Sequence, residues 1–445
     1  MVDIPEMRFA QVGEDRIAYQ VFGEGPPDLV YMSGTTDTVD LRWEWPPYAH
    51  FLRRLGSFSR VVVFDRRGQG ASDPVSRKGV SVWEDWAEDT RAVLDAVGSE
   101  RASLFAVTES TPIALLFAAT EPERTQALVL FAGTARFAAS EDYPWGLPLD
   151  ALVEAEAFFA RTWGTDEMAS MASSTLIDTA YRRWLAKSMR ASASAREAAV
   201  FLTQLRSIDV RQVLPTVRTP TLVIHQKGFP WVPVGQSRYL ADHLPDARLL
   251  VIDGDMGVPW VESVEETLRE AEAFVAGARH QTGAADRVLA TVLFTDIVGS
   301  TERAVTEGDR RWRTLSETHD TITGGVIDQH GGRVIRFTGD GVLATFDGPG
   351  RAVRCALALR DALRTLAIDI RAGIHTGEIE VHGDDISGIG VHLAARVMDQ
   401  ADPGQIWVSG TVPQLMAGSN VEFEPRGEWA LKGIPGEWPL YAVRA

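Results

Sequence analysis

The stretch Leu293-Phe-Thr-Asp-Ile-Val-Gly-Ser-Thr301 places Asp296 at the end of an apolar, β-prone run. A second stretch, Arg336-Phe-Thr-Gly-Asp-Gly341, places Asp340 in the same way, and its Asp-Gly pair is a strong hairpin signal. The pattern predicts a strand before each aspartate, so that Asp340 lies at a hairpin tip beside the strand that ends at Asp296. Two carboxylates in this arrangement can bridge two Mg²⁺ or Mn²⁺ ions about 4 Å apart. For either stretch alone, an ordinary turn aspartate is a serious rival interpretation.

A third motif argues against the interpretation of both residues as ordinary turn aspartates. Asp384-Asp-Ile-Ser-Gly-Ile-Gly-Val-His-Leu-Ala-Ala-Arg-Val397 leads from a turn into a predicted helix. Its His392 and Arg396 are four residues apart and therefore share one helix face. An arginine can bind a phosphate through two parallel hydrogen bonds, and a histidine can donate to a ribose or phosphate oxygen. Leu431-Lys-Gly433 supplies a further cation near the end of the chain.

From about Arg287 onward, the chain resembles the catalytic domain of class III adenylyl and guanylyl cyclases, in the bacterial subgroup with histidine on the catalytic helix. The motifs Phe-Thr-Asp-Ile-Val-Gly-Ser-Thr, Phe-Thr-Gly-Asp-Gly, Val-His-Leu-Ala-Ala-Arg and Leu-Lys-Gly follow one another in the family's order. The resemblance implies an α+β ferredoxin-like domain that works as a head-to-tail homodimer, with its sites at the dimer interface. It also implies ATP as the substrate and two divalent cations, Mg²⁺ or Mn²⁺, as cofactors.

The resemblance assigns roles to residues of both chains of such a dimer. Asp296 and Asp340 would bind the metals with the backbone of Ile297. From the other chain, Arg396 would stabilise charge on the transferring phosphoryl group, and Lys432 would bind the triphosphate.

Two positions depart from the commonest family pattern. Arg336 stands where the family usually has an adenine-reading lysine, and His392 replaces the usual asparagine. Asp385 fits the acid that selects adenine, so Arg336 and Asp385 favour ATP over GTP. Arginine reads planar acceptors differently from lysine, so we expect loose base selectivity. The expected reaction is that of an adenylyl cyclase, which converts ATP to 3′,5′-cyclic AMP and pyrophosphate.

The first 278 residues alternate short β-rich runs with helical patterns, which predicts a parallel sheet covered on both faces. An Ala- and Ser-rich region, about 136–206, is helical in character and is typical of an inserted cap. A helical pattern over 262–278 precedes a small, polar segment. We therefore expect a first domain over 1–278, a linker over 279–287 and a second domain over 288–445.

This first domain resembles an α/β-hydrolase. The resemblance rests on Phe64-Asp-Arg-Arg-Gly-Gln-Gly-Ala-Ser-Asp73 and on Leu115-Leu-Phe-Ala-Ala-Thr-Glu-Pro-Glu-Arg124, which precedes a predicted strand. The family's catalytic triad needs a serine in a tight strand-to-helix elbow, an acid and a histidine. Here Thr108 stands at the nucleophile position, Phe229 at the acid position and Met256 at the histidine position.

These replacements predict a pseudohydrolase that regulates the second domain or senses a ligand. A shifted triad, with Ser110 or Ser33 and His225 or His243, stays open as an alternative, as does a domain that only holds a dimer together. Nine tryptophans in the first 260 residues can line an apolar pocket for a hydrophobic small molecule, or can pack in the core. For the whole chain, the other hypotheses are a bifunctional esterase and cyclase, and a nucleotide-binding sensor whose cyclase has decayed.

Composition limits the remaining possibilities. The net charge of −17 argues against binding to nucleic acid or to an anionic membrane surface, because both need basic protein. The longest apolar stretch is too short to cross a bilayer. The single cysteine, Cys355, cannot form an internal disulfide, which fits a reducing compartment. We therefore expect a cytoplasmic protein without membrane insertion.

Overall fold

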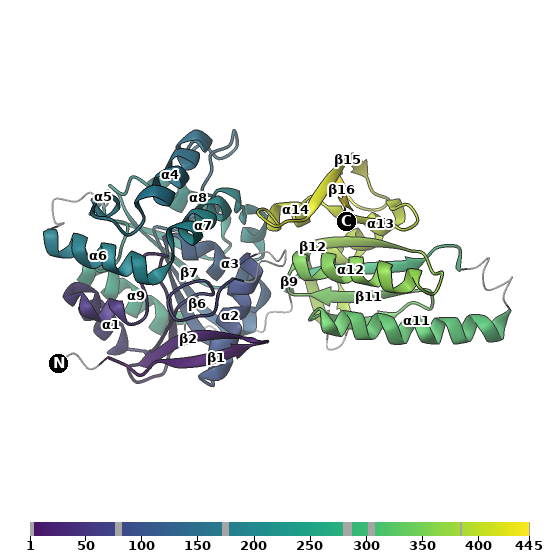
Figure 1. The fold of residues 1–445 in the computed structure, drawn as a ribbon, viewed down its shortest axis with the longest axis horizontal. Coiled ribbons are helices and arrows are strands. Elements are labelled where there is room, and N and C mark those ends of the chain that lie inside the picture. Colours follow the sequence, from purple (N-terminus) through teal and green to yellow (C-terminus); the bar gives the residue numbers. More distant parts are fainter. Residues whose placement is uncertain are drawn as a thin grey trace. The chain divides into compact units, whose positions relative to one another are not determined.

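The computed structural model describes residues 4–75, 82–170, 178–278, 287–300, 308–382 and 385–444. The chain folds into two compact units, which are described separately (Figure 1). Unit 1 comprises Met1–Arg77 and Asp85–Ala285, and the main part of unit 2 is Asp286–Ala445. Each unit has its own sheet and hydrophobic core. Residues 279–286, most of the predicted linker, lie outside the described residues.

Unit 1 is built on one sheet with the strand order β1-β2-β4-β3-β5-β6-β7-β8. The strands are β1 (Arg8–Val12), β2 (Asp15–Phe22), β3 (Asp28–Met32), β4 (Arg60–Phe64), β5 (Ala102–Val107), β6 (Thr125–Phe131), β7 (Thr221–Gln226) and β8 (Ala247–Ile252). The strands from β3 to β8 are parallel, as predicted. The antiparallel hairpin of β1 and β2, which extends this sheet at one edge, was not predicted from the sequence.

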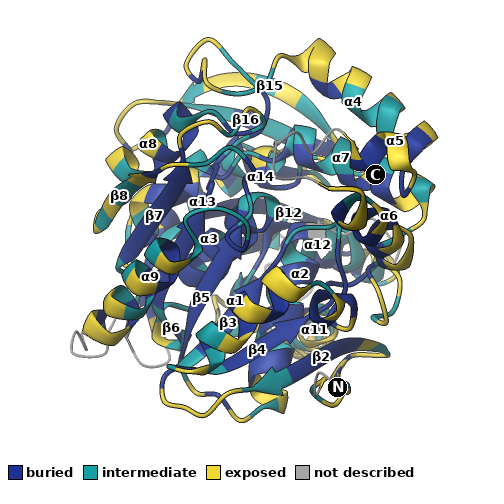
Figure 2. Ribbon diagram, turned by 90° about the vertical axis from the view of Figure 1, so that its left-hand side faces the viewer, coloured by how far each residue is buried: buried dark blue, intermediate teal, exposed yellow. Residues whose placement is uncertain are grey.

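Helices cover both faces of this sheet. They are α1 (Pro46–Gly56), α2 (Val82–Ala96), α3 (Thr111–Thr120), α8 (Val234–His243) and α9 (Val264–Ala278). Apolar residues of α1 and α9 pack together with alternate residues of the central strands. Side chains of α3 and α8 meet the opposite face near Leu130. Figure 2 shows the central strands as buried and the outer sides of α1 and α9 as exposed, which explains the near-continuous apolar runs of the strands.

Four helices are inserted between β6 and β7 and form a cap, in the region predicted as about 136–206. They are α4 (Leu149–Thr162), α5 (Asp166–Ala169), α6 (Thr179–Ser192) and α7 (Ala195–Ser207). Local sequence sets where two of them begin. The Asp178 side chain accepts a hydrogen bond from the backbone of Tyr181, and Ser194 and Glu197 form a capping box at the start of α7.

Unit 2 contains a second sheet with the order β10-β11-β9-β12-β14-β16-β15, and β13 pairs with β12. The strands are β9 (Arg287–Ile297), β10 (Arg333–Phe337), β11 (Gly341–Phe346), β12 (Ile370–His382), β13 (Asp385–Ser387), β14 (Ile406–Ser409), β15 (Glu422–Ala430) and β16 (Glu437–Arg444). With α11 (Asp309–Gln329) and α12 (Pro349–Arg364), the first four strands make the βαββαβ order of a ferredoxin-like core (Figure 1). β9 is longer than predicted, so Asp296 lies within the strand.

The two faces of this sheet carry different helices. α11 and α12 pack against the face that includes Leu293, while α13 (Ile389–Gln400) packs against the face that includes Val292. A short helix, α14 (Thr411–Leu415), follows β14. Gly373 in β12 lets α13 approach closely, because a Cβ there would lie 2.2 Å from the backbone nitrogen of Met398.

Candidate functional sites

The two predicted metal-binding aspartates of unit 2 lie at the same edge of the sheet. Asp296 in β9 is directly opposite Gly341 in β11, and Asp340 is the residue immediately before Gly341. The backbone N–H of Ile297 donates to the carbonyl of Asp340 over 2.7 Å, and the Ser300 hydroxyl donates to Oδ2 of Asp340 over 2.9 Å. Antiparallel pairing therefore brings together two carboxylates that are 44 residues apart in the sequence (340 − 296).

The pKa of Asp296 is subject to opposing influences at this edge of the sheet. Burial raises the pKa of Asp296, hydrogen bonding to Arg371 lowers it, and the nearby Asp340 raises it again. Within the described part of the chain, no group of three or more His, Cys, Asp or Glu side chains is placed to hold a metal ion. Two carboxylates nevertheless suit Mg²⁺, which is commonly bound through one or two carboxylates, water and substrate phosphates. The residues present therefore fit divalent cations that are shared with a phosphorylated ligand.

Arg371 belongs to this site and was missed from the sequence. It lies opposite Asp296 in the β9–β12 pairing, and its Nε and Nη2 donate to Oδ2 of Asp296 over 3.0 and 2.7 Å. Because side chains alternate along a strand, both residues lie on the α13 face of the sheet. The signal that was available is a charged residue within an otherwise apolar strand, Ile370-Arg-Ala-Gly-Ile374.

The two predicted base-reading residues come close to each other. Nη1 of Arg336 in β10 is 3.9 Å from Oδ2 of Asp385 in β13, and the side chains are 55% and 62% exposed. Both charged ends are therefore open to a ligand. A pair this exposed adds little to stability.

Arg396 and Lys432 form a third group. Nε of Arg396 donates to the backbone carbonyl of Lys432 over 3.1 Å, and its Nη1 donates to Asp399 over 2.8 Å. His392 is exposed one turn earlier on α13. Among the described residues, no hydrogen bond or ion pair joins this group to Asp296 or Asp340. Within one chain, the aspartates and the Arg396–Lys432 group therefore make no direct contact among the described residues.

In unit 1, the turn between β5 and α3 keeps the strained geometry of a nucleophile elbow. Thr108 has a φ of +47°, which is unusual for a β-branched residue. Its hydroxyl donates to the carbonyl of Gly257 over 3.4 Å, and Phe229 and Met256 line the same cavity as Thr108. The three residues predicted at the triad positions therefore line one cavity, and none of them is the residue that the family's triad uses.

Glu109 occupies the place where a hydrolase would stabilise its oxyanion. That hole is normally built from the backbone N–H after the nucleophile and an N–H of the loop after β3. Here the Glu109 carboxylate accepts from the N–H of Thr35 over 2.6 Å and from its hydroxyl over 3.0 Å. Gly34 makes room, because a Cβ there would lie 2.6 Å from Oε1 of Glu109. A carboxylate in this position repels a developing oxyanion.

The residues of the alternative triad do not pair with one another. The Ser110 hydroxyl donates to the carbonyl of Ser33, and the Ser33 hydroxyl donates to Asp37. His225 forms a hydrogen bond with the Ser237 hydroxyl over 2.8 Å, and His243 forms one with the backbone carbonyl of Tyr239. No nucleophile–base pair forms among these four described residues.

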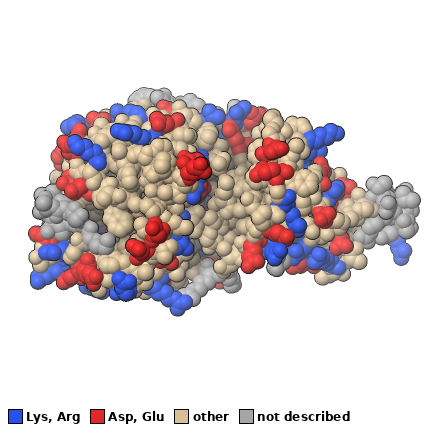
Figure 3. Space-filling model, turned by 90° about the horizontal axis from the view of Figure 1, so that it is seen from above, with Lys and Arg blue, Asp and Glu red and all other residues tan. Residues whose placement is uncertain are grey.

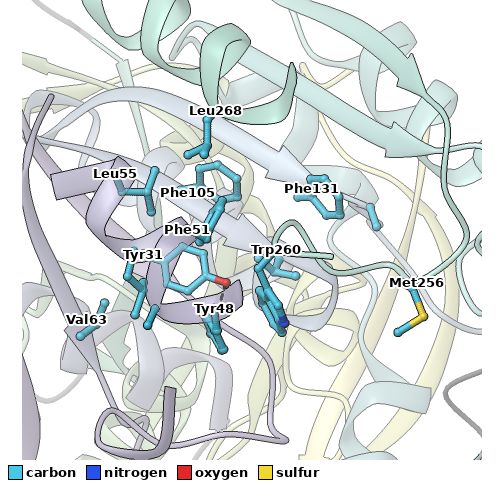
Figure 4. Close-up of a cluster of buried hydrophobic side chains, with 14 of the residues drawn as sticks. Tyr31, Tyr48, Phe51, Leu55, Val63, Phe105, Phe131, Met256, Trp260 and Leu268 are labelled. Carbon is cyan, nitrogen blue, oxygen red and sulfur yellow. Dashed lines mark hydrogen bonds between the residues drawn. The ribbon is translucent and has the colours of Figure 1, made fainter. Parts of the chain in front are cut away.

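The cap and the sheet of unit 1 line a mostly apolar cavity of about 260 Å³, which is partly open to solvent, beside Thr108. Of the nine tryptophans that could line a pocket or pack in the core, Trp231 and Trp260 line this cavity, and several of the others follow the core alternative. Trp43 and Trp184, for example, are buried and hydrogen-bonded in the core. Trp260 stacks on Tyr48, its neighbour in Figure 4, and the ring centres are 3.8 Å apart.

The visible surface does not gather charge of one sign. Acidic and basic side chains are interspersed over the face in Figure 3, so the net charge of −17 is spread out there. No helix among the described residues is both long and apolar enough to span a bilayer.

Comparisons with known proteins agree with this division of the chain. Residues 34–255 match the α/β-hydrolase fold, and residues 284–445 match the adenylate and guanylate cyclase catalytic domain. A Rhizobium meliloti protein named as a candidate adenylate cyclase is 32% identical over 157 residues, 33% of this chain and 27% of that protein. The serine/threonine-protein kinase pkn2 of Myxococcus xanthus is 28% identical over 159 residues, 34% of this chain and 19% of that protein. The chain thus spans well under a third of these relatives.

Solved structures show the fold of unit 1. An esterase from Exiguobacterium antarcticum matches with a TM-score of 0.54 and 18% identity, over 61% of this chain and 100% of that one. A hydrolase from Oleispira antarctica matches with a TM-score of 0.52 and 19% identity, over 58% and 94%. The chain therefore joins a domain of the α/β-hydrolase fold to a domain of the adenylate and guanylate cyclase catalytic family.

Proposed function

We propose that the chain is an adenylyl cyclase, which converts ATP to 3′,5′-cyclic AMP and pyrophosphate. The main support is the meeting of Asp296 and Asp340 at one edge of the sheet, where burial and the nearby Asp340 carboxylate raise the pKa of Asp296 against the opposing effect of Arg371. Two divalent cations, Mg²⁺ or Mn²⁺, fit these carboxylates together with the backbone of Ile297. When bound, the cations would lower the pKa of the ribose 3′-hydroxyl and offset charge on the triphosphate.

The remaining groups position the nucleotide. In the reaction, the 3′-hydroxyl attacks the α-phosphate in line and pyrophosphate leaves. Arg396 would stabilise the charge that develops on the α-phosphate, and His392 would donate to a ribose or phosphate oxygen. Lys432 would bind the triphosphate. Arg371 lies beside the carboxylates and can turn from Asp296 to the phosphates, because its side chain is one-third exposed. Positioning and electrostatic stabilisation would carry the rate.

We infer that each complete site forms between two copies of the chain. The aspartates and the Arg396–Lys432 group are separate within one chain, which supports a homodimer whose sites use one group from each copy. Arg336 and Asp385 would read the base. Asp385 can accept the adenine amino group while Arg336 donates to a ring nitrogen, which favours ATP, with loose selectivity because both side chains are exposed.

Unit 1 is proposed as a regulatory or ligand-sensing module without hydrolase activity. Glu109 in the oxyanion position supports this proposal, together with Thr108, Phe229 and Met256 at the triad positions. The rival, a bifunctional esterase and cyclase, requires Glu109 to leave Thr35. A second rival, a decayed nucleotide sensor, would bind ATP without turning it over.

The first experiment measures cyclic AMP formed by the full chain with ATP and Mn²⁺. Asp340→Asn should lower the rate by roughly a thousandfold or more, since one removed electrostatic group costs on the order of 100- to 1,000-fold and here the metals are affected too. Asp328→Asn, which changes an exposed acid of α11, is the matched control and should keep the rate. ATP binding without any cyclic AMP would instead support the decayed sensor.

A mixing experiment tests the shared site. Asp340→Asn and Arg396→Ala chains should each be inactive alone but regain activity when mixed, because one heterodimeric site then has both groups intact. If mixing restores nothing although heterodimers form, each site lies within one chain. Comparing the full chain with residues 280–445 tests regulation, and equal rates would contradict a regulatory role for unit 1.

A further inference from the structure

The cavity of unit 1 is lined almost entirely by apolar side chains. The cap contributes Phe159, Leu185, Met189 and Phe201, and the opposite wall contributes Met256 and Trp260. Its volume of about 260 Å³ lies just below the usual range for ligand pockets, ~300–1,000 Å³. A cavity of this size suits a small, mostly apolar molecule.

The charged residues in the wall are both acidic. They are Glu109 and Asp255, and no lysine, arginine or histidine is among the residues that line the cavity in the described structure. An apolar surrounding strengthens electrostatic interactions, so the sign of these charges matters for selection. A ligand with a carboxylate would meet repulsion here.

Glu109 already has partners. Its carboxylate accepts two hydrogen bonds from Thr35, and it attracts the buried guanidinium of Arg66, which lies 5.3 Å from the ring centre of Phe201, behind the cavity wall. Burial lowers the pKa of Arg66 to about 10, and the charge of Glu109 partly offsets this. The Glu109 carboxylate is therefore already held by hydrogen bonds within the protein.

Asp255 has one carboxylate oxygen without such a partner. Its backbone N–H donates to Glu262 over 2.7 Å, but its side-chain Oδ1 is buried and accepts no hydrogen bond from the described residues. Trp260, only 4% exposed, also lines the cavity, and its indole N–H has no acceptor there. An unsatisfied buried polar group costs ~1–3 kcal/mol, and more when it is charged. Both atoms point to a ligand that supplies a donor and an acceptor.

We propose that this cavity binds a small, mostly apolar amine whose head also carries an oxygen, such as a medium-chain amino alcohol. The protonated nitrogen donates to Asp255, and the oxygen accepts from the indole N–H of Trp260. The alkyl part fills the space under the cap. The aromatic rings of the wall favour a cation over an anion, since the faces of such rings attract positive charge.

Calorimetry on the full chain near neutral pH tests this with three probes of equal length: 2-amino-1-octanol, 1-octanol and octanoate. The amino alcohol should bind at least ~10-fold more tightly than octanol, because a charge-assisted hydrogen bond to Asp255 is added. Octanoate should not bind at concentrations up to about 1 mM. Octanoate binding as tightly as the amino alcohol, or no binding of any probe, would overturn the proposal.

Two variants locate the site. Asp255→Asn removes the charge and keeps the size, so the affinity for the amino alcohol should fall at least ~10-fold, towards that for octanol. The matched control is Asp253→Asn, in the same loop but 87% exposed, which should change nothing. Ala155→Trp on α4 fills the cavity and should abolish binding of both probes. Unchanged binding in Asp255→Asn and Ala155→Trp would refute this site.

Discussion

Arg371 allows a test that separates a structural role from a catalytic one. Its two hydrogen bonds reach a single carboxylate oxygen of Asp296 over 3.0 and 2.7 Å, with side chains that are 33% and 20% exposed. A charge-assisted hydrogen bond contributes ~1.5–3 kcal/mol when it is well buried. Solvent screening at this exposure reduces the contribution to about 1 kcal/mol. Arg371→Met should therefore lower the melting temperature of the cyclase unit by only ~2–4 °C.

The expected effect on the rate is much larger. If Arg371 turns to the phosphates in the complex, its loss removes a cation from the transition state, which costs ~100- to 1,000-fold in kcat. Arg371→Lys keeps the charge but loses the paired geometry, so it should recover part of the rate. Cyclic AMP formation over a range of ATP concentrations gives kcat and KM, and differential scanning fluorimetry gives the melting temperature.

Two results would refute this reasoning. A rate within about threefold of the parent chain would mean that Arg371 only shields Asp296, because the expected loss is far larger. Unfolding of the unit in both Arg371→Met and Arg371→Lys would mean that the contact to Asp296 is mainly structural.

Three further predictions concern other parts of the chain. Asp385→Asn should lower the ratio of ATP to GTP turnover by about tenfold, because the acceptor for the adenine amino group is weakened; Arg336→Lys, which keeps the charge, should change this ratio less, and equal ratios in all three proteins would contradict the assignment. Glu109→Gln should leave hydrolysis of p-nitrophenyl butyrate undetectable, because the triad is still missing; hydrolysis that Thr108→Ala removes would contradict the pseudohydrolase. Burial lowers the pKa of His375 from 6.5 to about 4, so the folded state resists its protonation. The free energy of unfolding of the cyclase unit should therefore keep this contribution above pH ~6.5 and fall by roughly 3 kcal/mol as the pH drops towards 4. Denaturant titrations at several pH values measure this dependence, which His375→Gln should remove. The same pH dependence in that variant would contradict the assignment to His375.

Local patterns were enough for many of the elements but not for contacts between distant residues. Apolar residues recur at helical spacing over 309–329, a pattern that predicts a helix, and α11 has those bounds in the structure. The end of β9 was placed too early, because pairing with β11 and β12 extends the strand through the polar residues Thr295 and Asp296. That extension is a tertiary effect, which the spacing of apolar residues alone does not reveal.

The sites divide in the same way. The proximity of Asp296 and Asp340 could be predicted because each comes at the end of a β-prone run and Asp340 stands in a hairpin signal with Gly341. Arg371 could not, since only the pairing of β9 with β12 places it against Asp296. The importance of Glu109 likewise becomes visible only in its contact with Thr35, which is 74 residues away in the sequence. For the tryptophans the sequence left pocket and core packing open, because a tryptophan buried in a core and one beside a cavity stand in similar sequence surroundings.

The close packing at Gly373 limits how this protein could be controlled. α13 lies so tightly on β12 that a side chain at residue 373 would collide with the helix backbone. Arg396 on α13 and Arg371 on β12 are therefore carried by one rigid body. In a dimer of the proposed kind, each copy contributes Arg396 to one site and Asp296 with Arg371 to the other site. Both contributions come from the same rigid body. A tilt of one copy against the other would then change both sites together, so that a regulatory signal would alter the rates at the two sites at the same time.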